Sequence, residues 1–205
     1  MRISKQRALS SVQKILDCNS FTHFITLTLN PSKIDRNDPN AVYSKVKTFL
    51  DNASRRHNFS YLLIPAYGPK GDGIHLHGVC NIGTLSVKRA TYDDGSPVYD
   101  KMGRDVFNVS AWKWGYSHVT AIDGSVVNIG NYCKGHIEES SSKVFGKWYL
   151  SSRNLVKGPE IELVDPIDFE EFRDQAKIDQ KQQFETKIYD GFSIISEEVV
   201  LRDDM

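Results

Sequence analysis

A short β-strand that carries two histidines constrains this chain more than any other stretch. It reads Gly71-Asp72-Gly73-Ile74-His75-Leu76-His77-Gly78-Val79. Because side chains alternate between the two faces of a strand, His75 and His77 are expected on the same side of a sheet. Two such imidazoles can share a divalent metal ion, with a carboxylate, carbonyl, amide or water at the remaining positions. Gly73 and Gly78 would let the backbone turn and leave room for a ligand. Paired surface histidines are the alternative interpretation.

The segments around this strand alternate between strand and helix patterns. Alternating apolar residues predict strands at 21–29, 61–65, 74–82 and 117–122, and helical spacing predicts helices at 4–18, 38–57 and 126–139. The second helix has a clear start, because Asp38 is a capping residue and Pro39 suits the first helical position. A polar insert at about 84–108 interrupts the order. The pattern predicts an α+β fold, with a small central antiparallel sheet and helices mainly on one face.

Charge divides the chain near residue 159. Residues 1–159 hold 21 Lys and Arg against 12 Asp and Glu, whereas residues 160–205 hold 5 against 14. We therefore expect one basic domain over 1–159 and an acidic, partly helical tail over 160–205, with an edge strand at 160–164 and helix-forming residues at 168–187. A basic domain favours a polyanionic partner. The tail would compete for that surface, face another protein or merely keep the chain solvated.

The remaining composition favours a cytoplasmic protein. The three cysteines, Cys18, Cys80 and Cys133, lack the close spacing of a zinc knuckle or a disulfide framework. The first residues lack the apolar core of a signal peptide. No stretch approaches the roughly 20 apolar residues of a membrane span, so no membrane partner is expected.

The predicted helix at 126–139 holds a second group of chemically active residues. Tyr132, Lys134 and His136 lie within little more than one turn. A phenol with an ordinary pKa near ~10 is a poor nucleophile at neutral pH. A lysine ammonium and a divalent metal can both stabilise charge on a phosphate, which would support attack of the tyrosine on a phosphodiester. The alternative is a helix whose tyrosine packs on the sheet and whose lysine is merely exposed.

Basic and aromatic side chains over the same domain fit single-stranded DNA. The candidates for phosphate contacts are Arg55, Arg56, Lys70, Lys88, Arg89, Lys101, Arg104 and Lys113, and those for base stacking are Tyr92, Tyr99, Trp112 and Trp114. One of the two tryptophans is expected in the core, because they alternate around Lys113. No phosphate-binding loop of the ATPase type is present, so unwinding would need a separate helicase.

Taken in order, these segments resemble the HUH endonuclease superfamily, and in particular the rolling-circle replication initiators of bacterial plasmids and phages. The similar stretches are Phe24-Ile25-Thr26-Leu27-Thr28, Tyr61-Leu62-Leu63-Ile64-Pro65, Gly73-Ile74-His75-Leu76-His77-Gly78, Trp114-Gly115-Tyr116-Ser117-His118-Val119, Tyr132-Cys133-Lys134 and Trp148-Tyr149-Leu150-Ser151-Ser152-Arg153-Asn154-Leu155. The resemblance covers about residues 21–159. It implies a ferredoxin-like or RRM-like HUH endonuclease fold.

The resemblance also implies a reaction. His75 and His77 would bind Mn²⁺ or Mg²⁺, Tyr132 would be the nucleophile, and Lys134 would be the helix lysine near the scissile phosphate or metal. Attack on a single-stranded origin, with or without a hairpin, would leave a 5′-phosphotyrosine and a free 3′-hydroxyl. That hydroxyl would serve a separate polymerase, and the reverse reaction would rejoin the strands.

Two departures from the family pattern leave alternatives open. One residue separates Tyr132 from Lys134 where the family has two, so their side chains diverge by about 200° on an ideal helix. Either Lys134 holds the family position and Asn131 stands where the tyrosine is expected, or the helix is locally distorted. The carboxylate that the family places before the histidines is also missing, so Asp72, His136 or water would have to replace it. A DNA-binding module of the same fold without chemistry, and a single-strand transposase or relaxase, remain alternative functions.

Overall fold

The computed structural model describes residues 2–68, 73–122, 126–140, 142–157, 178–187 and 193–201. The chain divides into two compact units, Met1–Pro159 and Glu160–Met205. Within the described ranges, no helix combines the length and the apolar character needed to cross a membrane.

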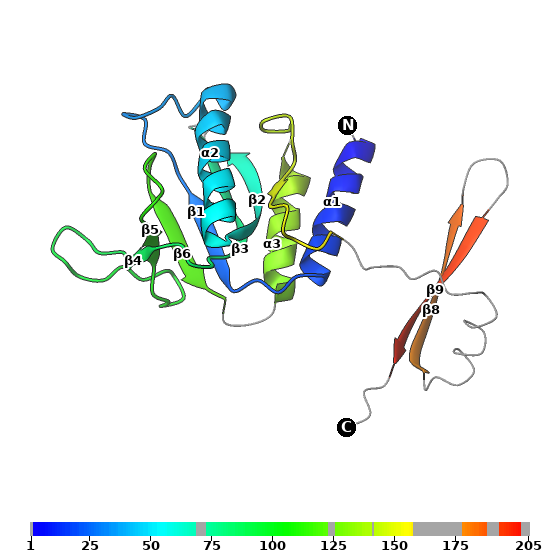
Figure 1. Ribbon diagram of the computed structural model, residues 1–205. Helices are drawn as coiled ribbons and strands as arrows, with labels where there is room; N and C mark the ends of the chain where they lie inside the picture. Colours follow the sequence, from blue (N-terminus) through cyan, green and yellow to red (C-terminus); the bar gives the residue numbers. More distant parts are fainter. Residues whose placement is uncertain are drawn as a thin grey trace. The chain divides into compact units, whose positions relative to one another are not determined.

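Unit 1 is an α+β domain built on one antiparallel sheet of seven strands (Figure 1). The strands are β1 (His23–Leu27), β2 (Ser60–Tyr67), β3 (Ile74–Asn81), β4 (Val87–Arg89), β5 (Phe107–Val109), β6 (Ser117–Ala121) and β7 (Leu150–Ser151), in the spatial order β4-β5-β6-β1-β3-β2-β7. Because β1 and β2 both pair antiparallel with β3, they run parallel to each other with β3 between them. A crossover helix is therefore needed between them, as the sequence predicted.

That crossover helix is α2 (Pro39–His57), and its ends follow the sequence signals. The carboxylate of Asp38 accepts hydrogen bonds from the backbone N–H groups of Asn40 and Ala41, and Pro39 begins the helix. Asn58 ends it in the left-handed conformation, with φ of 51°. Its buried face carries Val42, Val46, Phe49, Leu50 and Ala53. The prediction of a helix from Asp38-Pro39 to His57 is confirmed.

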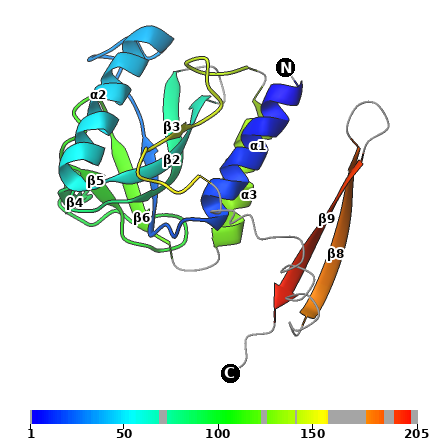
Figure 2. The ribbon, with the colours of Figure 1, turned by 45° about the vertical axis from the view of Figure 1, so that its right-hand side comes forward.

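Helices cover both faces of the sheet, which corrects the prediction that they lie mainly on one. α2 packs on one face, whereas α1 (Arg2–Asp17) and α3 (Val126–Glu139) pack on the other (Figure 2). The physical reason lies in β2, where six successive residues from Tyr61 to Ala66 are buried. A strand buried on both faces reads as a continuous apolar run, and it requires cover on both sides.

The N-terminal helix is fastened to the end of α3. The Nζ of Lys5 donates to the backbone carbonyls of Glu138 and Ser140, at 2.8 Å in each case. A cation at the C-terminal end of a helix satisfies carbonyls that have no partner within the helix. Lys5 therefore helps to hold α1 beside α3.

The insert extends the sheet. Its two short strands, β4 and β5, pair with each other, and β5 pairs with β6, so they form one edge of the sheet. Between them the chain makes a polar hairpin in which Asp100 accepts hydrogen bonds from the side chain and backbone of Arg104.

Unit 2 contains a two-stranded antiparallel hairpin, formed by β8 (Ile178–Lys187) and β9 (Ser193–Leu201). The sequence predicted a partly helical tail with helix-forming residues at 168–187, which is wrong for 178–187. The partner segment is rich in β-branched residues at 194–195 and 199–200, and cross-strand pairing with it outweighs the helix propensity of Gln and Lys. Residues 160–164 and 168–177 lie outside the described residues.

Candidate active site

β3 presents both histidines of the sequence motif to the α1 and α3 face. In the strand register, His77 lies opposite Thr26 and Ile64, and His75 lies opposite Ala66. The imidazole ring centroids of His75 and His77 are 5.3 Å apart. The prediction that the two histidines share one face of a strand is confirmed.

Gly78 lies within β3 and permits close pairing with β2. A Cβ atom built on it would lie 2.1 Å from the carbonyl oxygen of Leu62 on β2. Only a residue without a Cβ lets the two backbones approach this closely. The expectation that the chain turns out of the strand at Gly78 is wrong, because β3 continues to Asn81. Gly73, with a φ of 121°, does make the expected backbone turn.

A third histidine, His136, reaches the pair from α3. Its ring centroid is 4.1 Å from that of His77. The phase of the helix explains this contact, because Cys133 and Ile137 are fully buried in the apolar cluster beneath α3 and His136 lies beside them on the same side. His136 was one of the sequence candidates for the missing metal ligand, and we call His75, His77 and His136 the histidine cluster.

His77 is the most buried member of the cluster. Its side chain is 2 % exposed. Burial, followed by the proximity of His136 and His75, lowers the pKa of His77 to about 3. His77 is therefore a neutral imidazole at physiological pH, which is the form that binds metals and accepts protons.

The described donors of the cluster are all imidazole nitrogens. Imidazole suits transition metals, whereas Mg²⁺ prefers carboxylate, carbonyl and water oxygens. Among the residues that the structure describes, no group of three His, Cys, Asp or Glu side chains is arranged to hold a metal ion. Asp72, the sequence candidate for a carboxylate ligand, lies outside the described residues. The donor set thus fits a transition metal in its chemistry, with further ligands needed to complete the site.

Tyr132 lies in α3, one helical turn before His136. Only its backbone position belongs to the described part of the chain. Residues four apart on an α-helix lie on nearly the same side, so position 132 is on the His136 side of α3. The role of Tyr132 as nucleophile stays a prediction.

Lys134 is not brought to the histidine cluster. Its Nζ donates a hydrogen bond of 2.7 Å to the Oε1 atom of Gln13 on α1. Lys134 and His136 are two residues apart, which separates them by about 200° around the helix. The structure therefore places the predicted catalytic lysine at the contact between two helices.

The sequence reasoning missed His118, which lies on the same face of the sheet. His118 on β6 is opposite Thr26, and Thr26 is in turn opposite His77, so the three side chains form one row across β6, β1 and β3. Two strand spacings separate the histidines by roughly 10 Å. Burial is the main cause that lowers the pKa of His118. Of the two insert residues that also affect this pKa, Asp100 raises it and Arg104 lowers it. The alternation Ser117-His118-Val119, combined with the pairing of β1 and β6, was the signal that could have found it.

The predicted DNA-binding cations are dispersed over unit 1. Arg55 lines a cleft beside α2, while Arg56, Lys88, Arg89 and Lys113 are exposed elsewhere. Arg89 forms an ion pair with Asp105 at 2.5 Å. Arg104 forms one with Asp100 at 2.7 Å and donates to the carbonyl of Ala121. Lys70 lies outside the described residues.

The two predicted stacking tryptophans differ in environment. Trp112 is 5 % exposed, packs edge-on against Phe49 and donates from its indole to the carbonyl of Thr28. It is a core residue, which corrects its assignment to DNA stacking and agrees with the expectation that one tryptophan is buried. Trp114 is partly exposed, and the Nζ of Lys45 lies 4.8 Å from its ring centroid.

No protein-family model, curated protein or solved structure matches this chain. What the protein does must therefore be inferred from its own residues and their arrangement.

Proposed function

We propose that this protein nicks and rejoins single-stranded DNA through a covalent phosphotyrosine, as an HUH endonuclease that initiates rolling-circle replication of a plasmid or phage. The observation that carries the proposal is the contact between His136 and His77. It brings the helix that contains Tyr132 against the strand that contains both histidines of the motif.

The reaction would proceed by displacement at phosphorus. The phenolic oxygen of Tyr132 would attack the scissile phosphate, the bond from phosphorus to the 3′-oxygen would break, and the leaving oxygen would take a proton to become a 3′-hydroxyl. The tyrosine would remain bonded to the 5′-phosphate. Attack of a 3′-hydroxyl on this linkage would release the tyrosine and rejoin the strand.

The histidine cluster would supply two kinds of support. His75 and His77 are the residues that would hold a divalent ion such as Mn²⁺, which stabilises charge on the phosphoryl oxygens when bound. His136 is either a further ligand or the acceptor of the phenolic proton, since position 132 lies one turn away on the same side of α3. Lys134 is given no part in the reaction, because it is hydrogen bonded to Gln13.

A DNA-binding module without chemistry is the second candidate. Two observations favour it. Lys134 is directed to α1, and among the described residues no group of three His, Cys, Asp or Glu side chains is arranged to hold a metal ion. This candidate predicts binding of single-stranded DNA that survives chelation and produces no covalent product.

Denaturing electrophoresis would separate the two candidates. The protein is incubated with Mn²⁺ and labelled single-stranded DNA, including DNA from its own replicon, and the labelled protein band is measured. We expect a covalent adduct with the wild type and none with Tyr132→Phe or His75→Ala. Tyr116→Phe is the matched control, because Tyr116 is exposed outside the sheet and should leave the adduct intact. An adduct that persists in Tyr132→Phe would move the nucleophile elsewhere, and retained binding without any adduct would favour the second candidate.

A further inference from the structure

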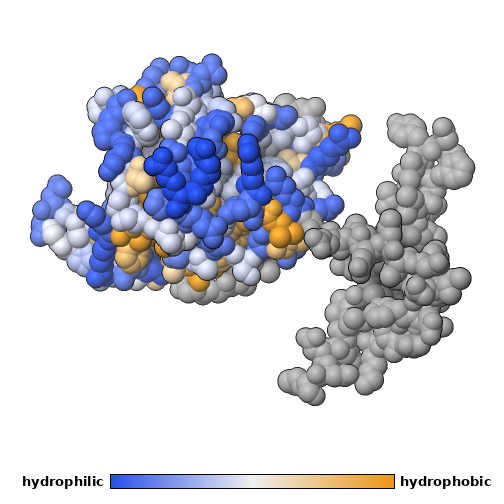
Figure 3. Space-filling view, in the orientation of Figure 1, coloured by the Kyte–Doolittle hydropathy of each residue, from blue (hydrophilic) through white to orange (hydrophobic). Residues whose placement is uncertain are grey.

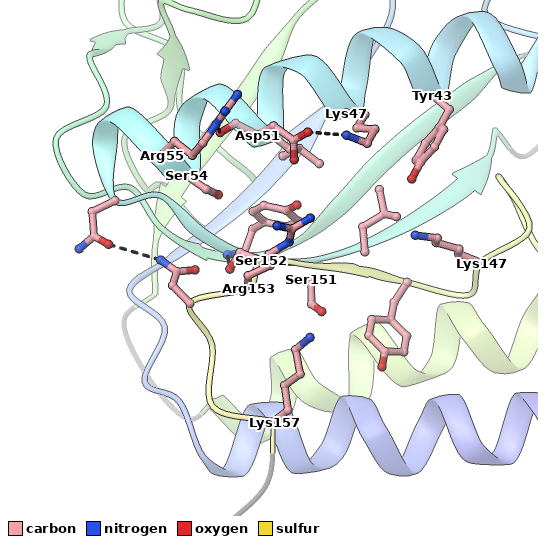
Figure 4. A pocket seen from close by; sticks show the side chains of 16 residues that line it. Tyr43, Lys47, Asp51, Ser54, Arg55, Lys147, Ser151, Ser152, Arg153 and Lys157 are labelled. Atoms are coloured by element: carbon pink, nitrogen blue, oxygen red, sulfur yellow. Dashed lines mark hydrogen bonds and ion pairs between the residues drawn. The ribbon is translucent and has the colours of Figure 1, made fainter.

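A cleft of about 680 Å³ lies at the β7 edge of unit 1, away from the histidine cluster. One wall is α2, the floor includes Tyr61 of β2, and the other wall is the segment 147–157. Figure 4 shows the lining side chains between these walls, with Tyr43 and Lys147 near one end and Arg55 toward the other. Tyr61 belongs to the apolar cluster on the α2 face, so the sheet separates its ring from His75 and His77.

The cleft has a strong excess of positive charge. Its lining includes five cationic side chains, Lys47, Arg55, Lys147, Arg153 and Lys157, against the single carboxylate of Asp51. That carboxylate forms an ion pair with Lys47 at 2.5 Å. Within the described part of the chain, the other four cations form no ion pair. The face that carries α2 is also largely hydrophilic (Figure 3). Such a concave surface of one sign concentrates polyanions.

Tyrosines are interleaved with these cations. Tyr43, Tyr61 and Tyr149 line the cleft, and the Nζ of Lys147 lies 5.8 Å from the ring centroid of Tyr43. Tyr43 and Tyr149 are partly exposed; Tyr43 also packs against Phe145, and Tyr149 packs against the apolar cluster beneath α1 and α3. Burial, followed by the proximity of Asp51, raises the pKa of Tyr61 to about 12, so its phenol remains a neutral hydrogen-bond donor. Cations that contact phosphates and rings that stack on bases are the two elements of a strand-binding groove.

We propose that this cleft binds single-stranded DNA as a second strand-binding site, separate from the histidine cluster. The cations lie on both walls of a space much larger than one phosphate, which favours a chain of phosphates over an isolated anion. An unpaired strand can place its backbone between the walls and its bases on Tyr43 and Tyr149, whereas the bases of a duplex are already paired and stacked on one another. This binding does not require the chemistry proposed for the histidines.

Fluorescence anisotropy of a 5′-labelled oligothymidylate on the full chain tests the proposal, in EDTA and at several salt concentrations. We expect Lys147→Ala combined with Arg153→Ala to weaken binding about tenfold and to reduce the slope of log K against log salt by about 1.4. Both side chains are exposed, so the fold should tolerate their removal. The matched control combines Arg7→Ala with Lys14→Ala, which removes the same charge from exposed positions on α1 and should change binding less than twofold.

Three results would overturn the proposal. Equal weakening in both double variants would mean that only the overall charge matters. Competition by polyglutamate or inorganic phosphate as strong as that of unlabelled oligothymidylate would mean a general anion site. Equal affinity for the corresponding duplex would exclude recognition of an unpaired strand. Because the assay is run in EDTA, where the metal-dependent nicking reaction does not take place, failure of the proposed nicking reaction would leave this result unaffected.

Discussion

The imidazole rings of His77 and His136 lie 4.1 Å apart between centroids, and they join the central strand β3 to the last helix of the domain. Neither the strand nor the helix alone forms the cluster. β3 positions His75 and His77 through its pairing with β1 and β2, and α3 positions His136 through the burial of Cys133 and Ile137. The cluster therefore depends on the whole fold of unit 1.

The stability of the protein should fall in acid because of His77. The pKa of His77 is about 3 in the folded protein, against an ordinary value of 6.5. Between these values the unfolded chain binds a proton that the folded protein does not, so the free energy of unfolding falls as the pH falls. We expect a loss of about 2 kcal/mol from this residue between pH 7 and pH 4.5, measured by urea denaturation.

His77→Gln should remove this part of the acid sensitivity, because glutamine does not titrate. His57→Gln is the control, since His57 lies in the last turn of α2, where its Nδ1 atom is hydrogen bonded to the hydroxyl of Thr84 in an exposed contact. This control should keep the wild-type difference in the free energy of unfolding between pH 7 and pH 4.5. An unchanged pH dependence in His77→Gln would show that His77 is not held neutral by the fold.

Transition metals should stabilise the folded protein more than Mg²⁺ does. The described donors are imidazoles, which bind Mn²⁺, Ni²⁺ or Zn²⁺ in preference to Mg²⁺. A ligand at 100 times its dissociation constant stabilises the folded state by about 2.7 kcal/mol, which a thermal unfolding scan detects as a higher midpoint. EDTA should abolish the shift.

His75→Ala should lose most of the metal-induced increase in the thermal unfolding midpoint, and His57→Ala should keep it. His75 is the suitable variant because it is only partly buried, so its truncation should leave the fold intact. A metal shift that is equal in His75→Ala and the wild type would place the bound ion outside the histidine cluster.

Gly78→Ala and Gly135→Ala should change stability in opposite directions. At Gly78 a Cβ would lie 2.1 Å from the carbonyl oxygen of Leu62, so β2 and β3 must separate. We expect a loss of at least about 2 kcal/mol in urea denaturation. At Gly135 no described atom beyond the backbone of its own helix lies within 4 Å of the added Cβ, and replacing a helical glycine should increase stability by about 0.5–1 kcal/mol. A neutral Gly78→Ala variant would mean that the two strands are not so closely paired.

Local patterns predicted the elements of unit 1 well. The capping residue and proline at Asp38-Pro39 predicted where α2 begins, and period-two alternation predicted that His75 and His77 share a face. These features depend on neighbours in the sequence. The joining of β4 and β5 to the sheet and the strands of unit 2 depend on pairing between distant segments, which propensity does not reveal.

The assembly of the site was less predictable, because it too depends on contacts between segments that are distant in the sequence. His118 joins the face of His77 only through the register of β6 on β1. The burial of Trp112 depends on its packing against Phe49 of α2, and the direction of Lys134 depends on the position of α1. Only one residue separates Tyr132 from Lys134, and this spacing predicted that their side chains diverge. In the structure, the ammonium of Lys134 contacts Gln13 of α1.

Lys134 should prove to be a structural residue rather than a catalytic one. Its ammonium donates to Gln13 in a partly buried contact between α3 and α1, at 2.7 Å. We expect Lys134→Met to lower the free energy of unfolding by about 1 kcal/mol in urea denaturation. Gln13→Met should have a similar effect. Because the two residues are partners, the double variant should lose less than the sum of the single variants.

The same variants test the proposed reaction. If the proposed nuclease activity is present, Lys134→Met and Gln13→Met should form the covalent DNA adduct at rates within about threefold of each other, since both remove only a helix contact. A rate that falls about 100-fold in Lys134→Met, but is unchanged in Gln13→Met, would require a role for the ammonium in transition-state stabilisation. Lys134 would then have to leave Gln13 when DNA binds, and the hydrogen bond between them would hold the lysine in an inactive position.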